Sequence, residues 1–279
     1  MRKTFTFAAA AAATALALTA CGGSSASSSA VESLDPADPV TLTVGASPQP
    51  HARILEFVDE NLAADAGLDL EIKEFDDYTT PNIALEDGSI DANYFQHLPY
   101  LEAQMQDQGY TFEHGEGVHI EPYAAFSDKH DDISKIGEGA RVAITNDPSN
   151  QARALMLLEE AGLLQDVSDD ASVLDLTDEQ NPKNLEFVEN QAELLVNDLS
   201  DPTVDLAIIN GNYILQAGLK TEDALLVESV DGNPYANFLV WNEGGADARV
   251  EKLEELLHSD EVRDFIKEQW PNGDVSPAF

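Results

Sequence analysis

The sequence predicts an α/β protein in which helices cover parallel sheets, in two lobes with a ligand cleft between them. Apolar strand-like runs alternate with amphipathic helix-like runs from Val40 to the C-terminus, a pattern typical of parallel sheets. Two long extended segments, 120–127 and 235–241, bracket a middle block that has strands and helices of its own. A chain that leaves one lobe and later returns joins the lobes by two crossings, which allows them to close by hinge motion.

The first twenty residues are predicted to be a signal peptide. Arg2 and Lys3 precede the apolar stretch 5–18, which is too short to be a typical membrane span. Small residues then precede the single cysteine, Cys21. This arrangement resembles a bacterial lipobox, which implies that Cys21 becomes the lipidated first residue of the mature protein. The alternative is an ordinary secretory signal with an incidental cysteine.

Residues 21–39 are predicted to form a flexible tether between the lipid anchor and the folded body. The run GGSSASSSAVESLDPADP is polar and low in complexity, so it cannot bury enough apolar surface to order itself. With one cysteine, the chain forms no internal disulfide. An exported protein on such a leash is expected to act on something that arrives from outside.

The charge balance excludes some classes of partner. The chain has 14 basic and 53 acidic residues and a formal net charge of −39 at pH 7. So acidic a surface argues against nucleic acid and anionic lipid headgroups as partners. We hypothesise that it reflects a salty habitat, in which screening reduces the repulsion between like charges.

The expected elements follow in order along the chain. Strand 40–45 precedes a helix that has Ile54, Leu55, Val58 and Leu62 on one side. The remaining elements are strands at 68–75 and 90–95, a helix over 98–108, an extended run at 123–127, a strand at 140–145, a helix over 149–161, strands at 185–189 and 204–209, a helix over 212–217, extended runs at 225–228 and 235–241, and a helix over 246–270 that breaks near Ser259. We predict lobe 1 from residues 40–127 and 238–279, and lobe 2 from residues 128–237.

Aromatic and imidazole side chains gather in the stretch 75–101. We expect a strand to pass directly to a helix here. Pro99 is suited to the first turn of that helix, because proline lacks an N–H that would be unpaired there anyway. His97 and Tyr100 are three residues apart, so we expect them to share one face of that helix. With Phe95 and Tyr78 they are predicted to line one wall of a small-molecule cleft, without performing chemistry.

Arg153 occupies an unusual position for a cation. The strand before Asp147 ends at a turn, and either Pro148 near the first helical position or Ser149 as N-cap is suited to start the next helix. Arg153 then lies near the positive end of the helix dipole. Helix amides and a guanidinium fork together suit a carboxylate. The alternative is a surface arginine paired with one of the many acids.

Two asparagines are candidate polar contacts. Asn210 follows the apolar strand 204–209, and the carboxyl ends of strands are where open α/β sheets bind ligands. Asn237 lies in the second extended segment. An amide offers both a donor and an acceptor to a zwitterion. The alternative for each is a turn or capping role.

The sequence contains no convincing motif for catalysis or metal binding. Among the six histidines, His114 and His119 come nearest to paired-ligand spacing, but no third ligand is evident in the sequence. The chain has no Gly-x-Ser-x-Gly, phosphate-loop or Gly-x-Gly-x-x-Gly motif. We therefore predict a protein that is not an enzyme and has no cofactor and no metal.

Four blocks carry a family resemblance: DDYTTPNIALEDGSIDANYFQHLPYL at 76–101, ITNDPSNQARAL at 144–155, AIINGNY at 207–213 and NPYANFLV at 233–240. With the lipobox, they resemble the NlpA/MetQ family of methionine-binding lipoproteins, the extracytoplasmic components of ABC importers. The resemblance runs from about residue 40 to the C-terminus. It implies a two-lobed, type II-like periplasmic-binding-protein fold that holds methionine between the lobes and delivers it to a permease and its ATPase subunit.

The resemblance also implies eight ligand-binding residues. Four would enclose the methionine side chain: Tyr78, Phe95, His97 and Tyr100. Two would hold the α-carboxylate: Asn150 and Arg153. Two would complete the polar contacts around the amino-acid head: Asn210 and Asn237. An aromatic enclosure suits a thioether, because sulfur–aromatic contacts contribute about 0.3–1.5 kcal/mol.

Some residues differ from the family pattern. A bulky residue stands in Asn93-Tyr94 where relatives often have a small one, and Gln151-Ala152 and Gly211-Asn212 are also unusual. The alternatives are therefore a different apolar amino acid or a short methionine-containing peptide as the ligand. A surface interaction protein that keeps the fold without a transport role is a further alternative.

Overall fold

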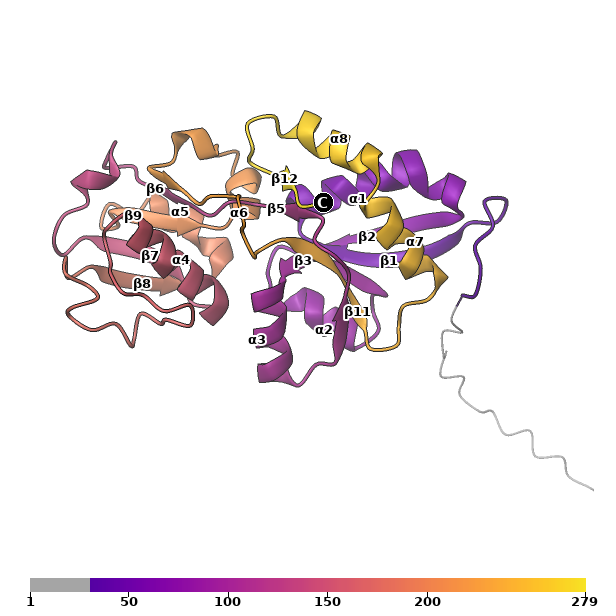
Figure 1. The fold of residues 1–279 in the computed structure, drawn as a ribbon, viewed down its shortest axis with the longest axis horizontal. Coiled ribbons are helices and arrows are strands. Elements are labelled where there is room, and N and C mark those ends of the chain that lie inside the picture. Colours follow the sequence, from indigo (N-terminus) through magenta and orange to yellow (C-terminus); the bar gives the residue numbers. More distant parts are fainter. Residues whose placement is uncertain (1–30) are drawn as a thin grey trace, which may run out of the picture.

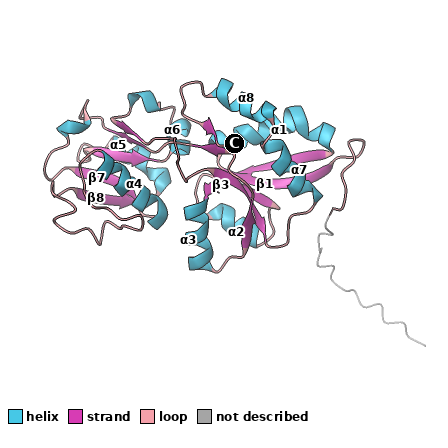
Figure 2. Ribbon diagram, in the orientation of Figure 1, coloured by secondary structure: helices cyan, strands magenta, loops and turns pink. Residues whose placement is uncertain are grey.

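The structure is a computed structural model that describes residues 31–279 (Figure 1). The predicted signal peptide, Cys21 and the first part of the predicted tether lie outside the described residues. The described chain forms two α/β lobes side by side, each built on its own sheet (Figure 2). No helix within residues 31–279 is long and apolar enough to cross a membrane.

The predicted tether contacts the folded body from Val31, before its expected end at residue 39. The backbone N–H of Val31 donates to Asp247, and its carbonyl accepts from the N–H of Ala248. Leu34 packs against the core of the first lobe. The segment that the sequence assigns to a tether up to residue 39 is therefore docked on the first lobe from Val31 onward.

The first lobe contains a seven-stranded sheet in the order β12-β5-β11-β3-β1-β2, with β4 paired to β11. Its strands are β1 Val40–Ala46, β2 Leu68–Glu74, β3 Ala92–His97, β4 Phe112–His114, β5 His119–Ile120, β11 Asn237–Asn242 and β12 Ser276–Pro277. β1 runs parallel to β2 and β3, whereas β11 runs antiparallel to β3.

The second lobe contains a five-stranded sheet in the order β10-β6-β9-β7-β8. Its strands are β6 Ala124–Phe126, β7 Arg141–Thr145, β8 Glu186–Asn190, β9 Leu206–Ile209 and β10 Leu226–Val227. β7 is parallel to β8 and β9, whereas β6 is antiparallel to β9. Both sheets are thus mixed. The prediction of parallel sheets holds for β3-β1-β2 and β9-β7-β8, which form one end of each sheet. It is wrong for the other strands, which pair antiparallel: β4, β5, β11 and β12 in the first sheet and β6 and β10 in the second.

Helices cover both sheets (Figure 1). The longer ones are α1 Arg53–Val58, α2 Thr80–Glu86, α3 Leu98–Gln108, α4 Pro148–Glu160, α5 Leu195–Leu199, α6 Gly211–Gln216, α7 Ala248–Leu257 and α8 Asp260–Gln269. Short helical turns occupy Pro48–Ala52, Asp59–Ala63, Ala64–Ala66, Ile133–Lys135, Ala192–Leu194 and Thr221–Asp223. The predicted break near Ser259 is confirmed, because the Ser259 hydroxyl caps α8 by accepting from the N–H of Val262.

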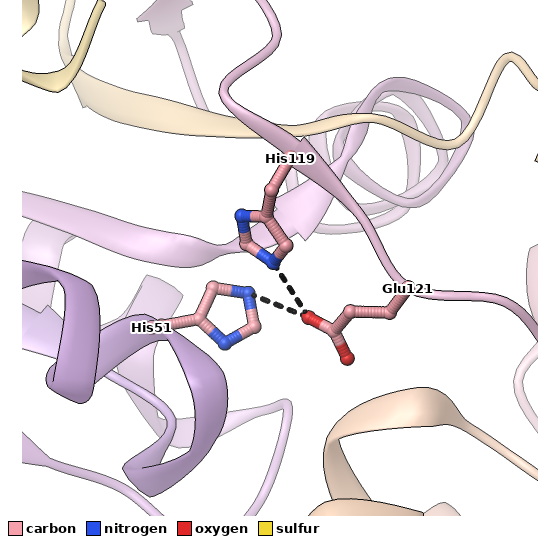
Figure 3. A group of neighbouring side chains, drawn as sticks. All are labelled: His51, His119 and Glu121. Carbon is pink, nitrogen blue, oxygen red and sulfur yellow. Dashed lines mark hydrogen bonds and ion pairs between the residues drawn. The ribbon is translucent and has the colours of Figure 1, made fainter. Parts of the chain in front are cut away.

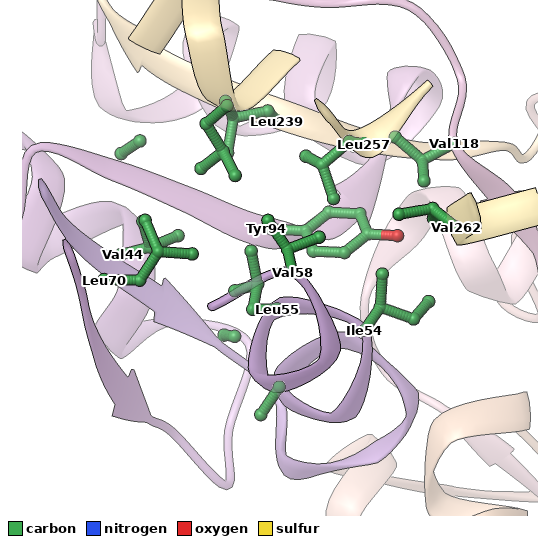
Figure 4. Packing of buried hydrophobic residues seen from close by; sticks show 14 of the residues in the cluster. Val44, Ile54, Leu55, Val58, Leu70, Tyr94, Val118, Leu239, Leu257 and Val262 are labelled. Atoms are coloured by element: carbon green, nitrogen blue, oxygen red, sulfur yellow. The ribbon is translucent and has the colours of Figure 1, made fainter. Parts of the chain in front are cut away.

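The core of the first lobe lies between β1–β3 and the helices α1, α7 and α8. Ile54, Leu55 and Val58, predicted to share one face, are all buried against the sheet together with Tyr94 and Leu257 (Figure 4). This is the expected result of helical spacing, because side chains three and four residues apart point to the same side of a helix. The second lobe has its own apolar core around β7 and α4.

Two extended crossings join the lobes, but the predicted boundaries need correction. β6 pairs with β9 and β10 in the second sheet, although the sequence assigns residues up to 127 to lobe 1. Asn237, assigned to lobe 2, begins β11 in the first sheet. Extended runs look alike in sequence, whether they pair in one lobe or connect both. Only the pairing shows that the first crossing ends before β6.

Candidate functional site between the lobes

A cavity lies between the lobes where three strands pass to helices. β3 leads to α3, β7 leads to α4 through a short turn, and β9 leads to α6. The empty volume is about 360 Å³, its opening to solvent included. It is lined by His51, Tyr78, Phe95, Gln96, His97, Tyr100, Glu121, Asn150, Arg153, Asn210, Gly211, Asn212 and Asn237. The structure therefore brings all eight residues that the sequence singles out to one cavity. Their role toward a ligand stays a prediction.

His97 links the two lobes at the start of α3. It is the last residue of β3 and the N-cap of α3, so it precedes the helix and does not share a helical face with Tyr100 as predicted. Its Nδ1 accepts from the Tyr100 N–H at 3.3 Å, and its Nε2 donates to Oδ1 of Asn150 at 3.1 Å. Burial and then the nearby charge of Arg153 lower the pKa of His97 to about 3, so the ring is neutral at pH 7.

Three aromatic rings form one wall of the cavity. The ring centroid of Tyr78 lies 6.1 Å from that of Phe95 and 5.8 Å from that of Tyr100, and Phe95 and Tyr100 are 5.9 Å apart. The Tyr100 hydroxyl donates to the Tyr78 carbonyl at 2.8 Å, and the Tyr78 hydroxyl donates to Oδ1 of Asn212 at 2.6 Å. Both hydroxyls are thus satisfied at the periphery of the wall. The wall offers ring faces and edges to an apolar group.

Arg153 is carried into the cavity by α4. Asp147 is the N-cap of this helix, since its carboxylate accepts from the N–H of Asn150 at 3.0 Å, and Pro148 begins the helix. The alternative cap, Ser149, is therefore wrong, whereas Pro148 is at the expected position. The side chain of Arg153 is only 5% exposed. The arginine is not a surface residue.

The guanidinium of Arg153 is nevertheless paired with an acid. Its Nε donates to Oε1 of Glu228 at 2.8 Å and its Nη2 to Oε2 at 2.5 Å, while Nη2 also donates to the Glu121 carbonyl at 3.0 Å. The rings of Tyr123 and Tyr235 lie 4.7 Å and 4.2 Å from the guanidinium carbon. Burial opposes the charge, but the bonds to Glu228 outweigh burial and raise the pKa of Arg153. Among the described residues, Nη1 has no hydrogen-bond acceptor.

The two predicted asparagines line the cavity from the residue after β9 and from the first residue of β11. Oδ1 of Asn210 accepts from the Tyr123 hydroxyl at 3.0 Å, and its Nδ2 donates to Oδ1 of Asn150 at 3.3 Å. Oδ1 of Asn237 lies 3.3 Å from Nε2 of His51. Asn210 is also the residue before α6, so the capping alternative describes its backbone position correctly. Its side chain, however, points to the other amides.

The comparisons with known proteins identify the family. The family model described as NlpA lipoprotein matches residues 42–279. The chain belongs to the NlpA lipoprotein family. Within it, the chain is 38% identical over 244 residues to the methionine-binding lipoprotein MetQ of Bacillus subtilis, covering 85% of this chain and 88% of that one. It is 36% identical over 247 residues to the D-methionine-binding lipoprotein MetQ of Escherichia coli, covering 86% and 90%.

Solved structures show the same fold. A lipoprotein from Actinomyces odontolyticus matches this NlpA-family chain with a TM-score of 0.81 and 46% identity, covering 87% of this chain and 100% of that one. A nutrient-binding protein from Burkholderia cenocepacia bound to methionine matches with a TM-score of 0.79 and 36% identity, covering 85% and 100%. The two-lobed periplasmic-binding fold that the sequence predicts is therefore confirmed.

Five residues that line the cavity of this NlpA-family protein were not foreseen from its sequence: His51, Gln96, Glu121, Gly211 and Asn212. Glu121 has the only carboxylate among the described lining residues. Burial raises its pKa to about 7, against the opposing effects of His51 and Arg153. An acid inside the otherwise apolar run VHIEPYAAF was the available indication. Because the chain has 53 acidic residues, Glu121 did not stand out among them.

Asn212 contributes a donor that lacks an acceptor. Its Oδ1 accepts from Tyr78, but its Nδ2 is buried and has no hydrogen-bond partner within residues 31–279. A buried donor without a partner costs about 1–3 kcal/mol. Two further side-chain donors of lining residues, Nη1 of Arg153 and Nδ2 of Asn237, also have no acceptor within residues 31–279.

Proposed function

We propose that this protein is a lipid-anchored, extracytoplasmic solute-binding protein of an ABC importer that binds methionine and delivers it to a permease. The observation that carries this proposal is the meeting of Arg153 with the wall of Tyr78, Phe95 and Tyr100 in one cavity between the lobes. A zwitterion with an apolar side chain matches both halves of the cavity.

The polar half of the cavity suits the α-carboxylate. Nη1 of Arg153 and the side-chain N–H groups of Asn212 and Asn237 are donors that such a group would satisfy. A charge-assisted hydrogen bond from a guanidinium is about twice as strong as a neutral one. The apolar half suits the thioether, because sulfur next to ring edges gains about 0.3–1.5 kcal/mol per contact.

The lobes provide a means of capture and release. They touch through α3 against α4 and through the turn Pro48–Ala52 against α6. Opening at the two crossings would expose the cavity, and closing on a ligand would bury it. Binding and release then need no chemistry in this chain, and the energy for transport comes from ATP hydrolysed by a partner ATPase. Lipidation of Cys21 would keep the protein beside its permease.

A ligand screen tests the proposal. Thermal unfolding is measured with each of the twenty amino acids, D-methionine and methionine-containing dipeptides, followed by calorimetry for the compounds that stabilise. We expect methionine to raise the melting temperature and to bind one to one. A larger shift with another amino acid or a dipeptide would replace methionine as the ligand. No shift with any compound would favour an interaction protein without a transport role.

A further inference from the structure

Two histidines and a glutamate meet behind the cavity (Figure 3). Nε2 of His119 lies 2.8 Å from Oε1 of Glu121, and Nε2 of His51 lies 3.3 Å from the same oxygen. One ligand atom from each residue lies within 4.8 Å of the others, and all three side chains are buried. His51 comes from the turn before α1, whereas His119 and Glu121 come from the first crossing. Sequence spacing pairs His119 with His114 instead, but His114 is exposed and stacks on Phe238.

Two of the three separations between these ligand atoms are close to those of a zinc site, and the third, between the nitrogens of the two histidines, lies within 4.8 Å. In a tetrahedral site with bonds of about 2.0–2.1 Å, neighbouring ligand atoms are about 3.3 Å apart. The 3.3 Å between His51 and Glu121 matches this separation, and the 2.8 Å between His119 and Glu121 needs to widen by about half an ångström. Two imidazoles and one carboxylate are also a donor set typical of zinc.

Hydrogen bonds alone leave this cluster incompletely satisfied. Nε2 of His51 has one proton at most, yet two oxygens lie 3.3 Å from it, Oε1 of Glu121 and Oδ1 of Asn237. Nδ1 of the same ring is buried and has no hydrogen-bond partner among the described residues. A cation at Nε2 would attract both oxygens at once. Nδ1 would then carry the ring proton and could donate it to a backbone carbonyl or water.

The surroundings resemble those of a metal ligand shell. Nδ1 of His119 is held by the hydroxyl of Tyr94, which fixes the ring with Nε2 directed at Glu121. When Nε2 of His119 binds a cation, Nδ1 carries the ring proton and donates it to the Tyr94 oxygen, as the second nitrogen of metal-binding histidines usually does toward an oxygen acceptor.

We propose that His51, His119 and Glu121 bind a divalent cation of the zinc class at the inner end of the cavity. His51 and Glu121 also line the cavity, so the fourth coordination position faces the space where a ligand would enter. If the proposed function holds, the amino or carboxylate group of the guest could occupy that position. The metal site itself does not depend on that function, because it is formed by the chain alone.

The test uses zinc ions alone with full-length protein freed of metal by a chelator. We expect one equivalent of Zn²⁺ to bind tightly and to raise the melting temperature. Loss of a residue that only hydrogen-bonds a metal ligand costs about 10–100-fold in metal affinity. Loss of a ligand itself, in Glu121→Gln and in His51→Gln, should therefore weaken binding by more than about 100-fold. His114→Gln removes an exposed histidine outside the cluster and should leave the affinity unchanged.

Two further measurements separate the possible outcomes. The many surface acids can bind zinc weakly, so equal binding by wild type and Glu121→Gln would overturn the proposal. Cobalt substitution checks the geometry without depending on the melting behaviour of a variant: strong visible absorption characteristic of tetrahedral cobalt is expected in wild type and in His114→Gln only. Methionine binding measured in the presence of the chelator tests the proposed function separately.

Discussion

At the scale of single residues, Arg153 shows how a buried charge can serve a cavity. The guanidinium uses two nitrogens to hold Glu228 and is flanked by the rings of Tyr123 and Tyr235. These contacts compensate for the loss of hydration that a buried ion suffers. They also hold the guanidinium in place, so little entropy would be lost if Nη1 binds a guest.

Replacing Arg153 by alanine should lower methionine affinity by an order of magnitude or more, because the ligand carboxylate loses its charged partner. Calorimetry measures this. The change also leaves Glu228 without its cation, so the double variant Arg153→Ala, Glu228→Gln serves to remove that penalty. Affinity should be low in both variants. Arg53→Ala, which changes a half-exposed arginine outside the cavity, is the matched control. Unchanged affinity in the double variant would refute the role of Arg153.

The substitution Asn212→Asp provides a sharper test, because aspartate has nearly the same shape as asparagine. Asn212→Asp keeps an oxygen that accepts from the Tyr78 hydroxyl, but it replaces the unpaired Nδ2 donor by an anionic acceptor. We expect methionine affinity to fall at least tenfold, since two carboxylates would face each other in a buried space. Calorimetry at pH 7 measures the change. Equal affinity in the two proteins would mean that the carboxylate binds elsewhere.

At the scale of elements, the site depends on junctions where a strand passes to a helix. His97 ends β3 and caps α3, Asn210 follows β9 and precedes α6, and Asp147 caps α4 after β7. Each junction places side chains that line the cavity. This is the usual position of ligands in open α/β sheets.

Two N-cap residues, Asp147 and Ser259, allow an effect on stability to be distinguished from an effect on binding. Asp147 accepts from both the backbone N–H and the side-chain amide of Asn150, whereas Ser259 caps α8, which has no residue lining the cavity. Either residue replaced by alanine should lower the free energy of unfolding by about 0.5–2 kcal/mol. Only Asp147→Ala should also weaken methionine binding, because it releases Asn150. Denaturant titration and calorimetry measure the two effects. Equal affinities would show that Asn150 is positioned by its other contacts.

At the scale of the whole molecule, the most prominent feature is the excess of acidic over basic residues. At a formal net charge of −39, the acidic side chains repel one another across the surface. Salt screens this repulsion between charges that are more than about 10 Å apart at 0.1 M and more than about 3 Å apart at 1 M. Several ion pairs of the described residues are exposed and local, such as Arg53–Glu56, Lys135–Asp131 and Lys220–Glu222. They contribute little to stability.

We therefore expect the melting temperature to rise steadily as sodium chloride increases from low concentration to 1 M. Calorimetric or fluorescence-monitored melting measures this. A neutral osmolyte at matched osmolality is the control for effects unrelated to charge. Melting that does not change with salt would remove the hypothesis of a salty habitat.

The sequence by itself determined the alternation of strands and helices, the presence of two extended crossings and the break near Ser259. These follow from local features, since periodicity, helix starts and strand ends are properties of neighbouring residues. The full set of eight candidate residues came from the family resemblance, and their role toward a ligand stays a prediction. Only the tertiary structure decided that β6 belongs to the second sheet, that Arg153 pairs with Glu228, and that His51 joins His119 and Glu121. These partners are distant in the chain. Among 53 acids, no local pattern distinguishes the few that packing buries beside a cation or an imidazole.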